Sequence, residues 1–128
     1  MTDKRPFQYA LIRAVPRVDR GEFINIGVII YCQTDDFLAA RIEINQPRLL
    51  ALDPDADLEA IRQSAEAVVA ACEAPVGHAR ENTGLATRFG ILTAPRSTVV
   101  QPSPIHAGVT ADPQQTLTAL LSRLVALP

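Results

Sequence analysis

The N-terminal third of the chain alternates hydrophobic and polar positions as β-strands do. Residues 7–15 are mainly aromatic and aliphatic up to Pro16, which has no amide hydrogen to give to a strand ladder. Residues 23–32 place one set of side chains on one face (Ile24, Ile26, Val28, Ile30, Cys32) and the others on the opposite face (Phe23, Asn25, Gly27, Ile29, Tyr31). Residues 38–45 alternate again after the polar turn 34–36. The simplest interpretation is an antiparallel meander of three strands.

Two later segments have the periodicity of amphipathic helices. Asp53 and Pro54 predict the start of the first helix, whose apolar stripe runs to Cys72. Asp112 and Pro113 predict the start of the second, with a stripe of leucines at 117, 120, 121 and 124. Between them, residues 82–92 predict a short helix and residues 97–101 a fourth strand, which Pro102 ends.

Strands followed by helices favour an α+β fold. We expect an antiparallel sheet of about four strands, made of the N-terminal meander and the later strand, in a single domain spanning residues 1–128. Both main helices would pack on the face that carries Ile24. The other face would then stay uncovered, so Phe23, Ile29 and Tyr31 predict an interface with a second copy or another protein.

Composition narrows the function classes. The 128 residues are 48% hydrophobic and carry 12 basic and 14 acidic side chains, which is typical of a globular protein and makes nucleic-acid binding an unfavoured function. We expect a cytoplasmic protein without membrane contact, because no apolar run of about 18 residues and no signal-peptide pattern is present. Cys32 and Cys72 lack partners at metal-ligand spacing, so neither a metal nor a cofactor is predicted.

A polar pair interrupts the second predicted strand. Asn25 is costly to bury without hydrogen bonds, and Gly27 leaves the same face without a side chain two residues later. The two predict a shallow polar notch on the sheet, to which Glu22, Arg41 and Glu43 would contribute. In the alternative interpretation, Asn25 bonds to a neighbouring loop and Gly27 makes room for an aromatic ring.

A second cluster predicts an anion site. Residues 82–111 contain two arginines and a histidine but no carboxylate. Guanidinium forks beside hydroxyl groups suit phosphate or carboxylate, because they donate paired hydrogen bonds. The candidates are Arg88, Arg96, Ser97 and His106, with Arg13 and Arg20 as further contributors. In the alternative interpretation, these arginines pair with the acidic stretch 49–81.

Four segments carry a family resemblance. They are residues 9–13, the run R-G-E-F-I-N-I-G-V-I-I from Arg20, Arg48 with Leu49, and the run T-A-D-P-Q-Q-T-L-T-A-L-L from Thr110. In these segments the chain resembles the bacterial domain-of-unknown-function family 3037. The resemblance implies no activity. It implies a small accessory or antitoxin-like subunit, because the genes of this family often lie beside those of kinases similar to the HipA toxin.

Two functions of different class follow. The first is a non-catalytic protein-interaction module or accessory subunit, which binds a second copy or a HipA-like kinase through the sheet face or the loop 102–112. The second is a binding or catalytic domain for a phosphorylated small molecule or nucleotide at the anion site. The lack of a recognisable nucleophile, metal set or acid–base pair favours the first and a protein without catalytic activity. Convergence of the arginines with Asn25 in one pocket would favour the second, and their dispersal would exclude it.

Overall fold

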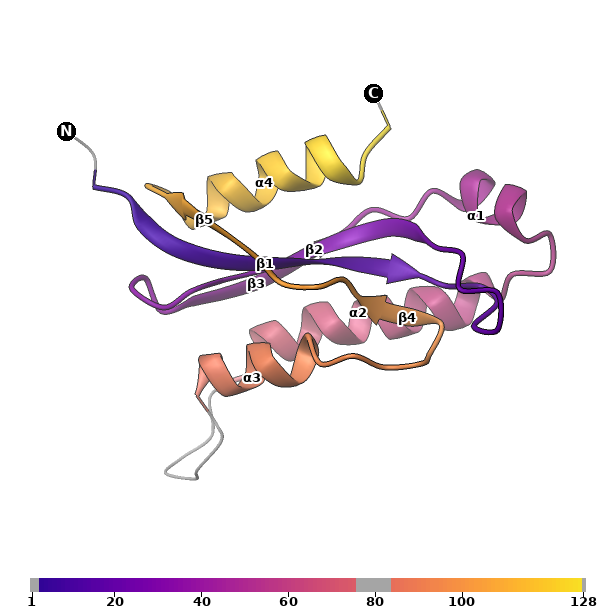
Figure 1. The fold of residues 1–128 in the computed structure, drawn as a ribbon, viewed down its shortest axis with the longest axis horizontal. Coiled ribbons are helices and arrows are strands. Elements are labelled where there is room, and N and C mark those ends of the chain that lie inside the picture. The colour runs from indigo at the N-terminus through magenta and orange to yellow at the C-terminus, as the bar shows by residue number, and fades with distance from the viewer. Residues whose placement is uncertain (1–2, 76–83, 128) are drawn as a thin grey trace.

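An antiparallel sheet of five strands forms the centre of the molecule (Figure 1). The computed structural model describes residues 3–75 and 84–127. The α+β class is confirmed, with one strand more than the expected four. The elements are, in order, β1 (Arg5–Ala14), β2 (Ile24–Cys32), β3 (Phe37–Ile42), α1 (Gln46–Leu52), α2 (Leu58–Glu73), α3 (Leu85–Leu92), β4 (Val100–Pro102), β5 (His106–Thr110) and α4 (Pro113–Leu124).

The strand order is β3-β2-β1-β4, and β5 also pairs with β1. Strands β4 and β5 share one edge of β1, because β4 pairs with residues 12–14 and β5 with residues 5–9. Ser103 fills the gap between them: its amide donates to the Leu11 carbonyl at 2.9 Å, and its hydroxyl accepts from the Leu11 amide at 2.7 Å. The chain therefore continues along β1 through a segment that the prolines had predicted to be a loop.

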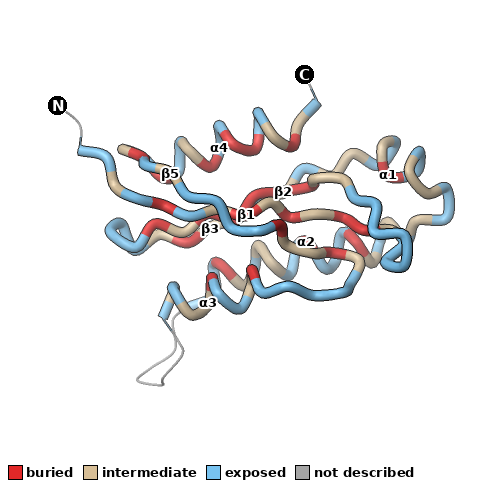
Figure 2. The backbone as a smooth tube through the Cα atoms, in the orientation of Figure 1, coloured by how far each residue is buried: buried red, intermediate tan, exposed pale blue. Residues whose placement is uncertain are grey.

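The helices cover both faces of the sheet (Figures 1 and 2). On one face, Val28, Ile30 and Cys32 pack with Leu117 of α4. On the other, Ile29 packs with α2 and α3 in a separate cluster. The prediction that both main helices lie on one face is therefore wrong. A sequence pattern shows which stripe of a helix is buried, but it does not say which side of a sheet receives that stripe.

A β-bulge explains how β2 serves two cores. Ile12 of β1 lies opposite Gly27, but Arg13 lies opposite Asn25, so Ile26 is an extra residue in β2. Beyond the bulge the side chains change faces. Ile24 and Ile26 therefore pack on the α2 side, whereas Val28 and Ile30 pack on the α4 side. The single apolar face predicted from Ile24 to Cys32 is divided between the two sides.

Of the two predicted helix starts, the one at Asp112 is confirmed and the one at Asp53 is wrong. Asp112 caps α4, as predicted, by accepting a hydrogen bond from the amide three residues later at 3.2 Å. The cap of α2 is Asp57, whereas Asp53 ends the short helix α1, which had not been predicted. Asn45 caps α1. The Asp-Pro pair at 53–54 has the composition of a cap, but the apolar stripe begins only at residue 58.

The short helix expected at 82–92 is confirmed over the described part as α3, and residues 82 and 83 lie outside the described residues. Phe89 of α3 is buried, and its ring stacks on Tyr31 of β2 with 5.5 Å between the ring centres. This contact anchors α3 beside α2 on the same face of the sheet. A further cavity remains between α2, the end of α3 and β4.

Candidate functional site

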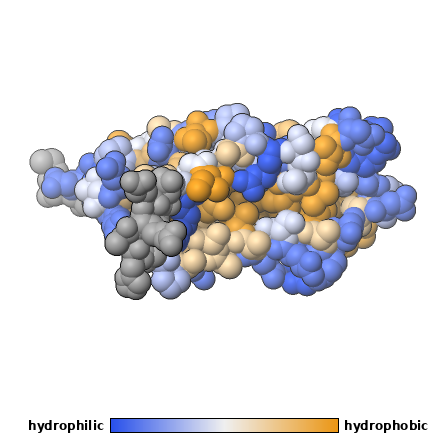
Figure 3. Space-filling view, turned by 90° about the horizontal axis from the view of Figure 1, so that it is seen from below, coloured by the Kyte–Doolittle hydropathy of each residue, from blue (hydrophilic) through white to orange (hydrophobic). Residues whose placement is uncertain are grey.

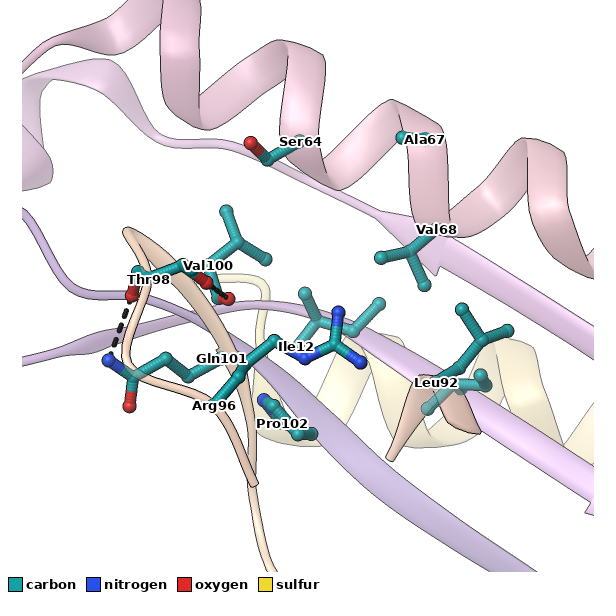
Figure 4. Close-up of a pocket in the computed structure, with 11 residues that line it drawn as sticks. Ile12, Ser64, Ala67, Val68, Leu92, Arg96, Thr98, Val100, Gln101 and Pro102 are labelled. Atoms are coloured by element: carbon teal, nitrogen blue, oxygen red, sulfur yellow. Dashed lines mark hydrogen bonds between the residues drawn. The ribbon is translucent and has the colours of Figure 1, made fainter. Parts of the chain in front are cut away.

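A pocket of about 350 Å³ opens between α2, the segment that follows α3, and β4 (Figure 4). Its walls are mainly apolar and come from five different elements: Ile12, Ile29, Val68, Leu92 and Val100, with Pro102 beside them. Apolar side chains also gather in the middle of this face of the molecule, between hydrophilic ends (Figure 3). The size lies within the range of small-molecule pockets, about 300–1,000 Å³.

The pocket exists because α2 and β4 do not meet closely. Helix α2 packs mainly on β3, at the opposite edge of the sheet from β4. The residues that α2 turns toward the gap include Ser64 and Ala67, which are small. Short side chains three positions apart lie on the same side of a helix and leave space beside it. Ile12 and Ile29 of the sheet, although buried, consequently border this space and line the pocket.

Arg96 is the charged residue of this pocket. Its guanidinium extends over the pocket between Ile12, Val68 and Leu92 (Figure 4). Nη2 donates to the carbonyl of Ile91 at 2.7 Å, and Nε makes a longer contact of 3.4 Å to another backbone carbonyl. Nη1 has no hydrogen-bond partner among the described residues, and no described carboxylate pairs with this arginine. Backbone carbonyls at the end of α3 thus hold the Arg96 guanidinium in place, and its Nη1 group is available to a ligand.

The segment before β4, β4 itself and α2 supply the remaining polar residues. The Thr98 hydroxyl donates to the carbonyl of Val100 at 2.7 Å, and the Gln101 side-chain amide donates to the carbonyl of Thr98 at 2.8 Å (Figure 4). These bonds tie the loop to the strand that it enters. Gln101 and, across the pocket on α2, Ser64 are the further polar residues of the lining.

The predicted anion residues do not converge. Arg88 donates to two backbone carbonyls at the end of α2, at 2.6 and 3.2 Å. His106 stacks on Tyr9 at the β5 edge, with 5.2 Å between ring centres. Arg20 forms an exposed ion pair with Glu22, at 2.6 Å, and this hydrogen bond lowers the pKa of the Glu22 carboxyl. The prediction of one site shared by these groups is wrong, because a stretch without acids on the sequence does not bring its cations together in space.

Two further residues of the predicted anion site also lie apart from the pocket. Arg13 packs on the opposite side of the sheet, with its guanidinium carbon 4.0 Å from the centre of the Phe23 ring. Ser97 follows Arg96 directly and is exposed, but the neighbouring Thr98 lines the pocket in its place. Of the six candidates, the structure places Arg96 in the pocket.

The predicted polar notch is not formed. The bulge turns Asn25 toward α4, where its amide donates to the Leu124 carbonyl at 3.3 Å. Gly27 faces the α2 side, where an added Cβ would lie 2.6 Å from the Arg41 carbonyl oxygen. The glycine is therefore needed for the close approach of β3 and Ile12 rather than for a polar site.

The other notch candidates have separate roles. The Arg41 guanidinium donates to the Thr118 hydroxyl of α4 at 2.9 Å, and Glu43 is exposed next to β3. Glu22 is held by its arginine partner in the β1–β2 turn. Arg13 Nε and Asn25 Oδ1 are buried without hydrogen-bond partners among the described residues. Arg13 Nε is a hydrogen-bond donor and Asn25 Oδ1 is an acceptor, and the two residues lie opposite each other on β1 and β2.

The predicted interface is closed within the chain. Ile29 is 1% exposed beneath α2 and α3, and the half-buried Tyr31 stacks on Phe89. Phe23 remains 45% exposed, but it packs with Arg13 on the α4 side. The prediction that these three residues form one uncovered sheet face is wrong, because the helices divide between the two faces and the bulge separates Phe23 from the others.

The α2 side of the pocket was not predicted from the sequence. Ser64, Ala67 and Val68 belong to a helix that was interpreted only through its buried stripe. A signal was present, because Ser64 and Ala67 are small residues at helical spacing next to that stripe. The contribution of β4 to the same pocket depends on its pairing with β1, which no local pattern announces.

The described residues hold neither a metal cluster nor a membrane-spanning helix. Over residues 3–75 and 84–127, no group of three or more His, Cys, Asp or Glu side chains is arranged to hold a metal ion. In the same part of the chain, no helix has the length and apolar character needed to cross a membrane. Cys32 and Cys72 are buried free thiols, and burial raises the pKa of the Cys72 thiol to about 11. A thiol with this pKa is largely protonated at neutral pH and is a weak nucleophile.

Comparison with known proteins identifies the chain by family alone. No curated protein and no solved structure gives a significant match. One family model, described as "Protein of unknown function (DUF3037)", matches residues 9–125. This range includes the strands β2 and β3 and every residue that lines the pocket. The match covers most of the chain, so the protein belongs to this family of unknown function.

Proposed function

We propose that the chain is a non-catalytic binding domain that takes a small molecule with an apolar body into the pocket between α2 and β4. The main support is the pocket itself, with apolar walls from five elements and a few polar residues among them. Pockets of this composition bury the apolar part of a ligand and use the polar groups to orient it. A cavity of about 350 Å³ has room for on the order of ten non-hydrogen atoms, at roughly 30 Å³ each.

The pocket supports this function better than docking through the sheet. Both faces of the sheet are covered by the chain's own helices, which removes the uncovered apolar surface that favoured a protein interface. Dispersal of Arg88, His106 and Arg20 likewise gives a nucleotide site less support than the pocket has. Partnership with a HipA-like kinase stays a prediction that rests on the family resemblance.

The test is a titration of the full chain with small amphiphiles that contain about ten non-hydrogen atoms, including octanol, octanamide and octanoate. Binding is measured by ligand-observed NMR and by calorimetry. Ala67→Phe should fill the pocket and weaken binding at least tenfold, because Ala67 lines it. Ala70→Phe is the matched control, since Ala70 is an exposed alanine of the same helix that does not line the pocket.

Both variants should melt close to the wild-type temperature, because each changes an exposed position. The proposal is overturned if no member of the series binds the wild-type chain. It is also overturned if Ala67→Phe binds the ligands as tightly as Ala70→Phe does, because binding would then lie outside this pocket.

A further inference from the structure

We infer that the ligand of this pocket is a monocarboxylate with an apolar body, whose carboxylate binds Arg96; the inference rests on the proposed function. The charge of the pocket is the first reason. Among the described residues that line it, Arg96 is the charged one, and no carboxylate accompanies it. The nearest stretch of sequence, residues 82–111, also contains no Asp or Glu.

The acids of α2 do not compensate this charge. Of the three acids of this helix, Glu59 and Glu66 both pair with Arg62, and Glu73 at its C-terminal end does not line the pocket. The Arg96 guanidinium instead contacts carbonyl oxygens, which are neutral groups. A ligand that brings one negative charge would therefore form an ion pair for which the described residues supply no partner, whereas a neutral ligand would not.

The geometry of Arg96 suits a carboxylate. Its inner edge is fixed by the bond of Nη2 to the Ile91 carbonyl, and Nη1 is available above the apolar walls (Figure 4). A guanidinium held in this way is partly pre-organised, so it loses less side-chain freedom when it donates charge-assisted hydrogen bonds to a ligand. The carboxylate would lie at the rim with its apolar body against Val68 and Leu92.

A single negative charge fits the pocket better than a phosphate dianion. The carbonyl end of α3 lies beside Arg96, and the partial negative charge of a helix C-terminus disfavours a second negative charge there. Phosphate sites usually gather several cations or amide donors. Arg88, which could have supplied a second cation, is bound to carbonyls at the end of α2 instead.

The decisive experiment compares a carboxylic acid with its amide, since the two have the same size and shape. Octanoate and octanamide are titrated at about pH 7 into the wild-type chain, Arg96→Leu and Arg88→Leu. We expect octanoate to bind the wild type at least fivefold more tightly than octanamide. Arg96→Leu should abolish this preference, so that octanoate and octanamide bind the variant within about twofold of each other. Arg88→Leu is the control, because Arg88 also donates to backbone carbonyls but lies outside the pocket lining.

The outcomes separate this inference from the proposed function. Equal binding of acid and amide to the wild type would overturn the carboxylate inference and leave a binding pocket in place. A preference that survives Arg96→Leu would also overturn it, because another group would then recognise the charge. Tighter binding of octyl phosphate than of octanoate would assign the pocket to a phosphate ester instead. Binding of neither acid nor amide would remove the proposed function itself.

Discussion

Leu117 packs α4 against the sheet, and its replacement by alanine is expected to lower the free energy of unfolding substantially. The side chain is fully buried in the cluster that contains Val28, Ile30 and Cys32. Truncation of a buried leucine to alanine typically costs about 2–5 kcal/mol, from the lost burial and from the cavity that remains. A domain of this kind has a free energy of unfolding of about 5–15 kcal/mol. Leu117→Ala should therefore fold, with a clearly lower resistance to urea.

Urea denaturation followed by circular dichroism measures this loss. With a slope of about 1–3 kcal/mol per molar urea, the midpoint should fall by on the order of 1–2 M. Ser122→Ala is the control, because Ser122 is exposed on the same helix and its replacement should change stability by less than about 0.5 kcal/mol.

The side of the sheet on which α4 lies can be tested with two double-mutant cycles. Ile30→Val lies in the same cluster as Leu117, whereas Ile61→Val lies in the cluster on the opposite face. Leu117→Ala should couple to Ile30→Val by at least about 0.5 kcal/mol and should add to Ile61→Val within about 0.5 kcal/mol. Coupling to Ile61 without coupling to Ile30 would refute the two-sided arrangement, because it would put α4 beside α2.

Three further predictions concern single positions. Gly27→Ala should lower the free energy of unfolding by about 1–3 kcal/mol, because its Cβ would lie 2.6 Å from a backbone carbonyl oxygen. Gly90→Ala should raise it by up to about 1 kcal/mol, because a Cβ there meets nothing within 4 Å. Thermal melts in which both variants shift the melting temperature in the same direction would contradict this. Cys72 should react with iodoacetamide at about pH 8 roughly a hundredfold more slowly in the folded than in the urea-unfolded chain, because its pKa is raised from 9.0 to about 11. Mass spectrometry gives the two rates, and equal rates would show that the thiol is not buried. The hydrogen bond from Arg5 lowers the pKa of Asp35 in the folded state. The stability that this pair contributes is therefore present above the ordinary carboxyl pKa of 3.8 and is lost as the pH falls through the lowered folded-state value. Between about pH 5 and pH 2, urea midpoints should fall less in Asp35→Asn than in the wild type, and identical profiles would exclude the pair as a source of acid sensitivity.

Much of the secondary structure follows from local chemistry in the sequence. The cap and the leucine stripe of α4 are both where the pattern predicts them, since a cap and a stripe depend on residues within a few turns of one another. The faces could not be predicted in the same way. Both faces of β2 are apolar, so the alternation around Ile26 looks regular, and the extra residue is visible only through the pairing of Ile12 and Arg13.

The candidate site was only partly predictable for a similar reason. Arg96 could be named because the sequence around it has no acids. Its companions Ser64 and Val68 are far away in the sequence and reach the pocket through the packing of α2 on β3. Arg88 shares the local lack of acids but finds carbonyl acceptors at the end of α2, so the composition of a segment did not determine the surroundings of its side chains.

The extra residue at Ile26 also affects how this gene can change length. Deletion of one residue inside a strand normally moves the side chains on one side of the deletion to the opposite face of the sheet. Here the codon for Ile26 is an exception, because Asn25 and Gly27 already point to opposite sides and would become ordinary neighbours. Shortened homologues are therefore expected to lack this position rather than Val28 or Ile29, at the expense of one buried isoleucine.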